Sequence, residues 1–263
     1  MTMVPVSPSI RSLFAAVIVV LLAASASRAS EADLAIPDLK TATFFDGAIS
    51  GHDLLLYGSF VIAGTLGISL FLRRQIKALP AHESMLRVAD VIFETCKTYL
   101  LKQAQFLGLL FALIAAAMAY YFLVLKQESP VTLGLVLLFS IVGIVGSFWV
   151  AWYGIRVNTY ANARTAFAAL RGEPWDVVNI PLRAGMSIGL FLISLELIMM
   201  VVILLFVPRT IVGYCFLGFA IGESLGASAL RIAGGIFTKI ADIGSDLMKI
   251  AFKVKEDDPR NPA

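Results

Sequence analysis

Five apolar segments, each long enough to cross a lipid bilayer, limit what this chain can fold into. They lie at about 54–72, 104–125, 131–155, 184–207 and 211–238. A helix of about 20 residues spans the hydrocarbon core, and within lipid only helices and closed barrels satisfy every backbone polar group. The composition agrees, because 59% of the residues are hydrophobic and only 15% are charged. The sequence therefore predicts an all-α membrane protein with five transmembrane helices, the last continuing to about residue 250.

The N-terminal region has the pattern of a secretory signal, and we expect residues 1–29 to be a signal peptide. A basic residue precedes the apolar run Leu13–Ala24, and small residues that suit cleavage after Ala26 or Ala29 follow it. The alternative is an uncleaved first membrane helix, for which the run is short. Residues 30–53 are polar and mostly acidic, which indicates a short extracytoplasmic segment.

The charges between the apolar segments predict the orientation of the chain. Basic residues concentrate in the first and third connections: Arg73, Arg74, Lys77, Arg87, Lys97 and Lys102, then Arg156, Arg164, Arg171 and Arg183. The second connection has only Lys126 and the fourth only Arg209. Because Lys and Arg favour the cytoplasmic side, we expect a bacterial inner-membrane protein with its mature N-terminus outside and its C-terminus in the cytoplasm. A net charge of +3 gives no reason to expect nucleic-acid binding.

The residues that follow the fifth segment suggest a charged site where its helix leaves the membrane. At about 100° per residue, Lys239, Asp242 and Asp246 fall within about 60° of one another, and Arg231 lies about 20° outside that arc. Arg231 is also about 12 Å from Lys239 along the helix axis. Carboxylates are hard oxygen ligands that suit Mg²⁺, and a lysine beside them suits a phosphate. From spacing alone, a salt-bridged stripe at the membrane surface explains these residues equally well.

Two further carboxylates lie inside the apolar segments themselves. Glu196 is in the fourth segment and Glu223 is in the fifth. Either could carry a proton, because ionisable groups within a bilayer are costly and usually functional. The simpler interpretation is a hydrogen-bonded contact between helices.

Two C-terminal motifs carry a resemblance to a known family. RIAGGIFTKIADIGSDL (Arg231–Leu247) and EDDPRNPA (Glu256–Ala263) resemble motifs of the membrane-bound, ion-translocating pyrophosphatases. Arg87–Gln103 is similar to the first cytoplasmic segment of that family, and Gly154–Leu170 to its ANART region. The resemblance extends from roughly Leu54 to the end. Family members are much longer, so we expect this chain to be the N-terminal portion of a larger helical bundle.

The resemblance implies an ion pump that couples hydrolysis of Mg-pyrophosphate on the cytoplasmic side to outward transport of H⁺ or Na⁺. It implies that Lys239 binds pyrophosphate and that Arg231 takes part in ion coupling. It assigns Mg²⁺ to four carboxylates: Asp242, Asp246, Glu256 and Asp257. It also implies a homodimer, whereas the choice between H⁺ and Na⁺ and any dependence on K⁺ stay open. No catalytic residue is assigned within this chain.

The chain also departs from the family pattern. The stretch after Leu247 is one residue short, which would turn Glu256 by about 100° on a helix. The aspartate-rich segment that follows in the family is missing, so we expect this chain alone to be inactive. The competing hypothesis is a non-catalytic membrane scaffold, either truncated or one half of a split pump that needs a second chain. A small five-helix transporter would leave the cytoplasmic carboxylates unexplained.

Overall fold

Five long helices make up almost all of the computed structural model, which describes residues 36–44, 47–255 and 258. The short strands β1 (Thr43–Phe44) and β2 (Ile49–Ser50) pair antiparallel before the first of these helices. The bundle follows: α2 (Gly51–Ala78), α3 (Glu83–Tyr120), the π-turn η2 (Tyr121–Leu125), α4 (Pro130–Arg171), α5 (Pro174–Phe206) and α6 (Arg209–Phe252). All five are long and apolar enough to cross a membrane, so the predicted all-α class with five membrane helices is confirmed.

The helices extend beyond the apolar segments from which they were predicted. The third apolar segment ended at about 155, but α4 continues to Arg171, and the second began at about 104, whereas α3 begins at Glu83. Hydropathy marks where lipid ends, whereas a helix ends where its backbone is capped. Gly172 ends α4 in the left-handed conformation, with φ of 71°. The side chains of Ser50 and Ser129 accept hydrogen bonds from backbone N–H groups in the first turns of α2 and α4.

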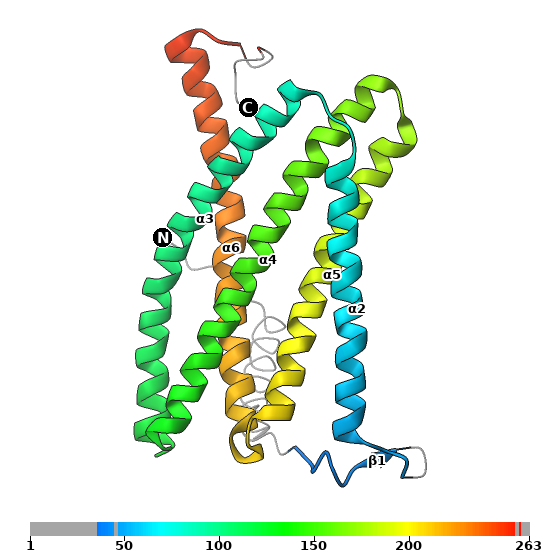
Figure 1. Ribbon diagram of the computed structural model, residues 1–263. Coiled ribbons are helices and arrows are strands. Elements are labelled where there is room, and N and C mark those ends of the chain that lie inside the picture. The colour runs from blue at the N-terminus through cyan, green and yellow to red at the C-terminus, as the bar shows by residue number, and fades with distance from the viewer. Residues whose placement is uncertain (1–35, 45–46, 256–257, 259–263) are drawn as a thin grey trace, which may run out of the picture.

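Helix α4 runs through the middle of the bundle, with α6 and α3 on one side and α5 and α2 on the other (Figure 1). Its contact with α6 is close because glycines line the crossing. A Cβ atom on Gly222 would overlap the carbonyl oxygen of Ser140, and one on Gly226 would lie 2.8 Å from the Cβ of Ser147. The Ser140 hydroxyl donates across this contact to the carbonyl oxygen of Gly218, at 2.8 Å. Small residues allow such contacts where lipid offers no hydrophobic drive between helices.

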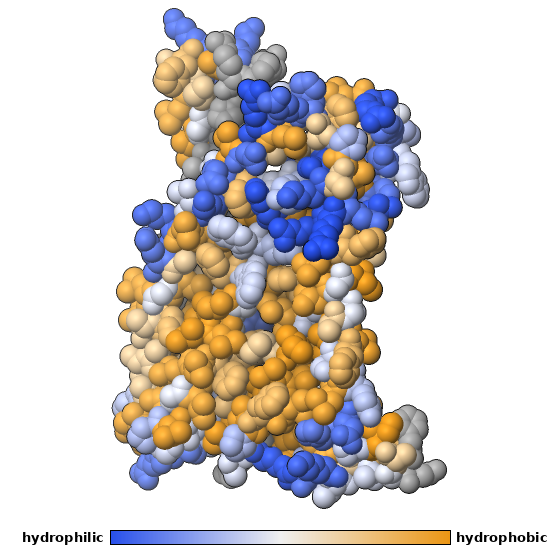
Figure 2. All heavy atoms as spheres, viewed as in Figure 1, coloured by the Kyte–Doolittle hydropathy of each residue, from blue (hydrophilic) through white to orange (hydrophobic). Residues whose placement is uncertain are grey.

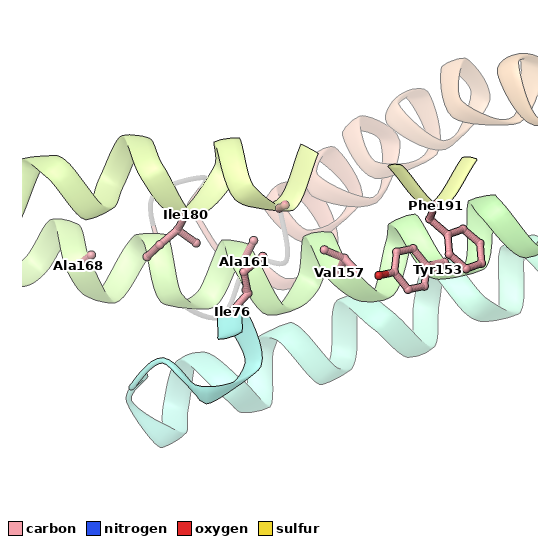
Figure 3. Close-up of a cluster of buried hydrophobic side chains, with 8 residues drawn as sticks. Ile76, Tyr153, Val157, Ala161, Ala168, Ile180 and Phe191 are labelled. Atoms are coloured by element: carbon pink, nitrogen blue, oxygen red, sulfur yellow. The ribbon is translucent and has the colours of Figure 1, made fainter. Parts of the chain in front are cut away.

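A buried cluster joins α2, α4 and α5 (Figure 3). The rings of Tyr153 and Phe191 stack with centroids 4.2 Å apart. The Tyr153 hydroxyl is 3.0 Å from the Ser69 hydroxyl and 2.9 Å from the Ser187 hydroxyl. The Ser69 hydroxyl also donates to the backbone carbonyl of Ser187, at 2.6 Å. The hydroxyl groups thus find hydrogen-bond partners within the protein, because the hydrocarbon core of a bilayer offers no water to take their place.

The surface shows a broad hydrophobic belt between two hydrophilic ends (Figure 2). Large apolar side chains of the belt are exposed, among them Phe60, Leu109 and Trp149, as expected of side chains that face lipid rather than water. The chain is therefore an integral membrane protein. The upper end in Figures 1 and 2 holds the α2–α3 and α4–α5 connections and the end of α6, and we call it the charged end.

Candidate functional site

Helix α6 carries the candidate site past the membrane on one unbroken helix. Its apolar span is Arg209–Arg231, yet the helix continues to Phe252. In Figure 1 this continuation projects from the charged end of the bundle. Arg231, Lys239, Asp242 and Asp246, which we call the α6 stripe, therefore follow one another along a continuous helix, as their spacing predicted. Lys239 and Asp246 are about 10 Å apart along the axis, at 1.5 Å per residue.

The structure leaves the stripe residues exposed. Arg231, Lys239 and Asp242 are all exposed on α6. Asp246 is exposed as well and forms an ion pair with Lys249, at 3.2 Å. An exposed pair of this kind contributes little stability, about 0–1 kcal/mol, so the Asp246 carboxylate can exchange this partner for another cation at small cost.

Among the described residues, the exposed face of α6 offers possible metal ligands from one side only. Within that described part of the chain, no group of three or more His, Cys, Asp or Glu side chains could hold a metal ion together. Glu256 and Asp257, which were predicted to share the metal site, lie outside the described residues. The donor set of Asp242 and Asp246 still fits Mg²⁺, because both are oxygen donors on one exposed face beside a lysine. Such a face can bind one flank of a metal-bound phosphate.

Helix α3 is fastened to α6 next to the stripe. The Gln103 side-chain N–H donates to the backbone carbonyl of Ala229 at 3.2 Å, two residues before Arg231. Gln103 is the last residue of Arg87–Gln103, the stretch that resembles the first cytoplasmic segment of the family. The sequence suggested no structural role for Gln103, because its partner is 126 positions away. The contact fixes the point at which α6 leaves the bundle.

Arg164, the arginine of the ANART stretch, is a buried structural clamp. Its guanidinium donates to the carbonyl oxygens of Lys77 at 2.7 Å, Leu79 at 3.1 Å and Tyr160 at 2.9 Å. Lys77 and Leu79 lie at the end of α2, where backbone carbonyls lack helical partners. The planar fork of an arginine suits several acceptors at once. Arg164 therefore holds the α2–α3 connection against α4.

A neighbouring arginine packs on aromatic rings at the same end. The Arg156 guanidinium lies 3.9 Å from the Phe93 ring centroid and 4.9 Å from that of Tyr160. It is also 3.8 Å from the Asp90 carboxylate. Arg156 thus joins α3 to α4. The positive charges of the first and third connections serve in part to assemble the charged end.

Comparison with known proteins identifies similar sequences along most of the chain. The family described as inorganic H⁺ pyrophosphatase matches residues 62–263. A relative from Chlorobaculum tepidum, named a K⁺-insensitive pyrophosphate-energized proton pump, is 56% identical over 207 residues. The match covers 79% of this chain and 28% of that relative.

More distant relatives share the same description or a related one. A K⁺-insensitive pyrophosphate-energized proton pump from Pyrobaculum aerophilum is 34% identical, over 70% of this chain and 25% of its own length. A putative K⁺-stimulated pyrophosphate-energized sodium pump from Bacteroides thetaiotaomicron is 29% identical, over 80% of this chain and 30% of its own length. The chain therefore spans between a quarter and a third of the length of these relatives. No solved structure matches the chain.

Proposed function

Because the chain belongs to the inorganic H⁺ pyrophosphatase family, we propose that it forms the N-terminal membrane helices and one wall of the substrate site of a pyrophosphate-driven ion pump. The observation that carries the proposal is the continuation of α6 beyond Arg231, which presents Lys239, Asp242 and Asp246 on one exposed face. A purely structural stripe would be expected to pair its charges, yet among the described residues of this face only Asp246 forms an ion pair.

The chemistry of the face suits magnesium pyrophosphate. Lys239 places an ammonium group where it can bind a phosphate oxygen. Asp242 and Asp246 offer carboxylate oxygens to the metal that accompanies the substrate. Mg²⁺ bound there would neutralise the substrate and stabilise the charge that develops when water attacks phosphorus. The remaining ligands, including Glu256 and Asp257, would close the site from other directions.

We further propose that the transported ion is H⁺ and that K⁺ is not required. The relative with 56% identity is named a K⁺-insensitive proton pump, which favours this choice over Na⁺. Arg231 would take part in ion coupling, because it lies about 12 Å from Lys239 toward the membrane. A guanidinium keeps its proton, so Arg231 would bind and release a carboxylate rather than relay a proton.

The proposed orientation puts the charged end in the cytoplasm of a bacterial inner membrane. The support is the concentration of basic residues in the α2–α3 and α4–α5 connections. Cysteines at positions 255 and 40, in a chain with Cys96 and Cys215 replaced by alanine, test this orientation with a membrane-impermeant thiol reagent. We expect labelling from outside at position 40 alone. Labelling of position 255 from outside would overturn both the orientation and the cytoplasmic site. Homodimerisation is a further proposal, which in-membrane crosslinking tests.

Hydrolysis is tested with this chain alone and with a chimera in which the Chlorobaculum relative supplies the sequence after position 263. We expect the chain alone to insert into membranes without hydrolysing pyrophosphate, because its described ligands lie on one side only. We expect the chimera to hydrolyse Mg-pyrophosphate and to acidify sealed vesicles. Lys239→Ala should abolish hydrolysis in the chimera, whereas Lys97→Ala, a control on α3, should not. Arg231→Ala should reduce ion uptake at least as much as hydrolysis.

Two outcomes would count against the proposal. Substantial hydrolysis by the chain alone would show that the other ligands are unnecessary. A folded chimera that is inactive, beside an active Chlorobaculum protein, would favour a non-catalytic scaffold.

A further inference from the structure

Two glutamates meet in the middle of the membrane-spanning region. Glu196 on α5 lies 10 residues before Phe206, and Glu223 on α6 lies 14 residues after Arg209. At 1.5 Å per residue, they are about 15 Å and 21 Å from the hairpin that joins the two helices. The hydrocarbon core is about 30 Å thick, so both residues lie well inside it.

The two side chains line the same cavity and reach each other. The cavity has a volume of about 230 Å³ and lies between α4, α5 and α6. Glu196 on α5 and Glu223 on α6 both line it, and their carboxyl groups lie close enough to interact. The wall is otherwise apolar apart from Ser147 on α4, with Trp149, Met199 and Phe219 among its members. The Ser147 hydroxyl donates to the backbone carbonyl of Glu223, at 3.1 Å, rather than to a carboxylate.

No positive charge balances this pair within the described part of the chain. Besides the two glutamates, the described lining has no ionisable side chain on α4, α5 or α6. Neither glutamate forms an ion pair with any described basic residue. Arg231 lies on the same helix as Glu223, but about 12 Å further toward the charged end.

This arrangement determines the charge that the pair can carry. Two carboxylates in contact repel each other, and each loses the hydration that stabilises its charge when it leaves water. A hydrogen bond between two carboxyl groups also needs a proton, because an ionised carboxylate is only an acceptor. The pair is therefore stable only if it retains at least one proton.

We propose that Glu196 and Glu223 form a proton-binding site within the membrane, in which one proton is shared between two carboxyl groups on different helices. The ligand is H⁺ rather than a metal cation. A desolvated metal ion needs oxygen ligands on several sides, whereas this cavity offers two carboxyl groups against an apolar wall. The site is separate from the α6 stripe, and its existence does not depend on pyrophosphate hydrolysis.

The position of the site suggests what it does in a pump. On α6 it lies between the α5–α6 hairpin and Arg231, whereas Lys239, Asp242 and Asp246 lie beyond Arg231. Because its two members stand on different helices, any movement that separates α5 from α6 would break the shared hydrogen bond and favour release of the proton. The pair can therefore couple helix movement to proton binding.

Infrared spectroscopy of the whole chain in lipid vesicles tests the site directly. A protonated carboxyl group gives a C=O stretching band that an ionised carboxylate lacks. At pH 7 we expect such a band in the unsubstituted chain and in Glu94→Gln, a control on the exposed face of α3. The band should be absent from Glu196→Gln/Glu223→Gln. In each single variant it should disappear at a lower pH than in the unsubstituted chain, by about one unit or more, because the like-charged neighbour is gone.

Several results would overturn the proposal. One is a spectrum in which the unsubstituted chain and the double variant have the same carboxyl band at pH 7. Another is loss of the band on addition of Na⁺ at constant pH, which would assign the pair to a metal cation. Helix content measured by circular dichroism on the same samples distinguishes loss of the site from loss of the fold. Because no step requires hydrolysis, failure here and failure of the pump assignment give different results.

Discussion

Replacement of Arg164 by methionine should loosen the charged end of the bundle. The Arg164 side chain is only 7% exposed. It donates to the carbonyl oxygens of Lys77 and Leu79, at 2.7 and 3.1 Å, and to that of Tyr160 within its own helix. Methionine fills similar space but donates no hydrogen bond. Two carbonyls at the end of α2 would then lose the donor that fastens them to α4.

The size of the effect follows from these contacts. A hydrogen bond to a charged donor contributes about 1.5–3 kcal/mol, so the two bonds between helices amount to about 3–6 kcal/mol. Water at the charged end can satisfy part of this loss, and we expect a net destabilisation of about 3 kcal/mol. That corresponds to roughly a 100-fold change in the unfolding equilibrium. Arg164→Lys should destabilise the chain by less than Arg164→Met, because an ammonium keeps the charge but cannot present the planar fork of a guanidinium.

Unfolding by SDS in mixed micelles, followed by tryptophan fluorescence, measures this difference. Arg171→Met is the matched control, because Arg171 is on the same helix but half exposed, in an ion pair with Glu173. We expect the control to unfold like the unsubstituted chain and Arg164→Met to unfold at a clearly lower SDS fraction. Equal midpoints for Arg164→Met and Arg171→Met would refute the clamp.

Two further predictions concern the α4–α6 contact and the N-terminal segment. Gly222→Leu should separate α4 from α6 and destabilise the chain by about 3 kcal/mol in the same assay, because its Cβ would overlap the α4 backbone. The control Gly64→Leu, which lies in open space on α2, should leave the stability almost unchanged. The backbone N–H of Lys40, together with Arg209, holds the pKa of Asp38 below its usual value. Since ionised Asp38 makes these contacts, their stabilisation is present above about pH 4 and lost as pH falls through the lowered pKa. Hydrogen exchange of the turn at 38–42 should therefore be slower than in Asp38→Asn at neutral pH and equal at low pH.

The sequence predicted the membrane helices well because a single physical requirement determines them. About 20 apolar residues must cover the hydrocarbon core, and each of the five segments met that requirement. The predicted ends were less accurate, because α3 and α4 continue through polar residues to caps that hydropathy does not detect. The stripe spacing needed only an unbroken helix, and α6 provides it from Arg209 to Phe252.

The contacts that the sequence could not predict join distant residues. Arg164 binds carbonyls 85 and 87 positions earlier in the chain, and backbone acceptors leave no pattern in a sequence. Glu196 and Glu223 were recognised separately as ionisable residues in apolar segments. Their meeting depends on how α5 and α6 pack around α4, which neither segment reveals alone. The ion pair of Asp246 with Lys249 is local, and the i,i+3 spacing could have suggested it.

Hydrolysis by variants of the Chlorobaculum chimera tests the central claim most directly. The rate of phosphate release from Mg-pyrophosphate should fall by at least about 100-fold in Asp242→Asn and in Asp246→Asn, because each removes a charge that would hold Mg²⁺ in the proposed site. Asp90→Asn, an exposed carboxylate on α3, should keep the rate of the unsubstituted chimera. If Asp242→Asn and Asp246→Asn both retained near-normal hydrolysis, the α6 stripe would be structural and its assignment to the substrate site would be wrong.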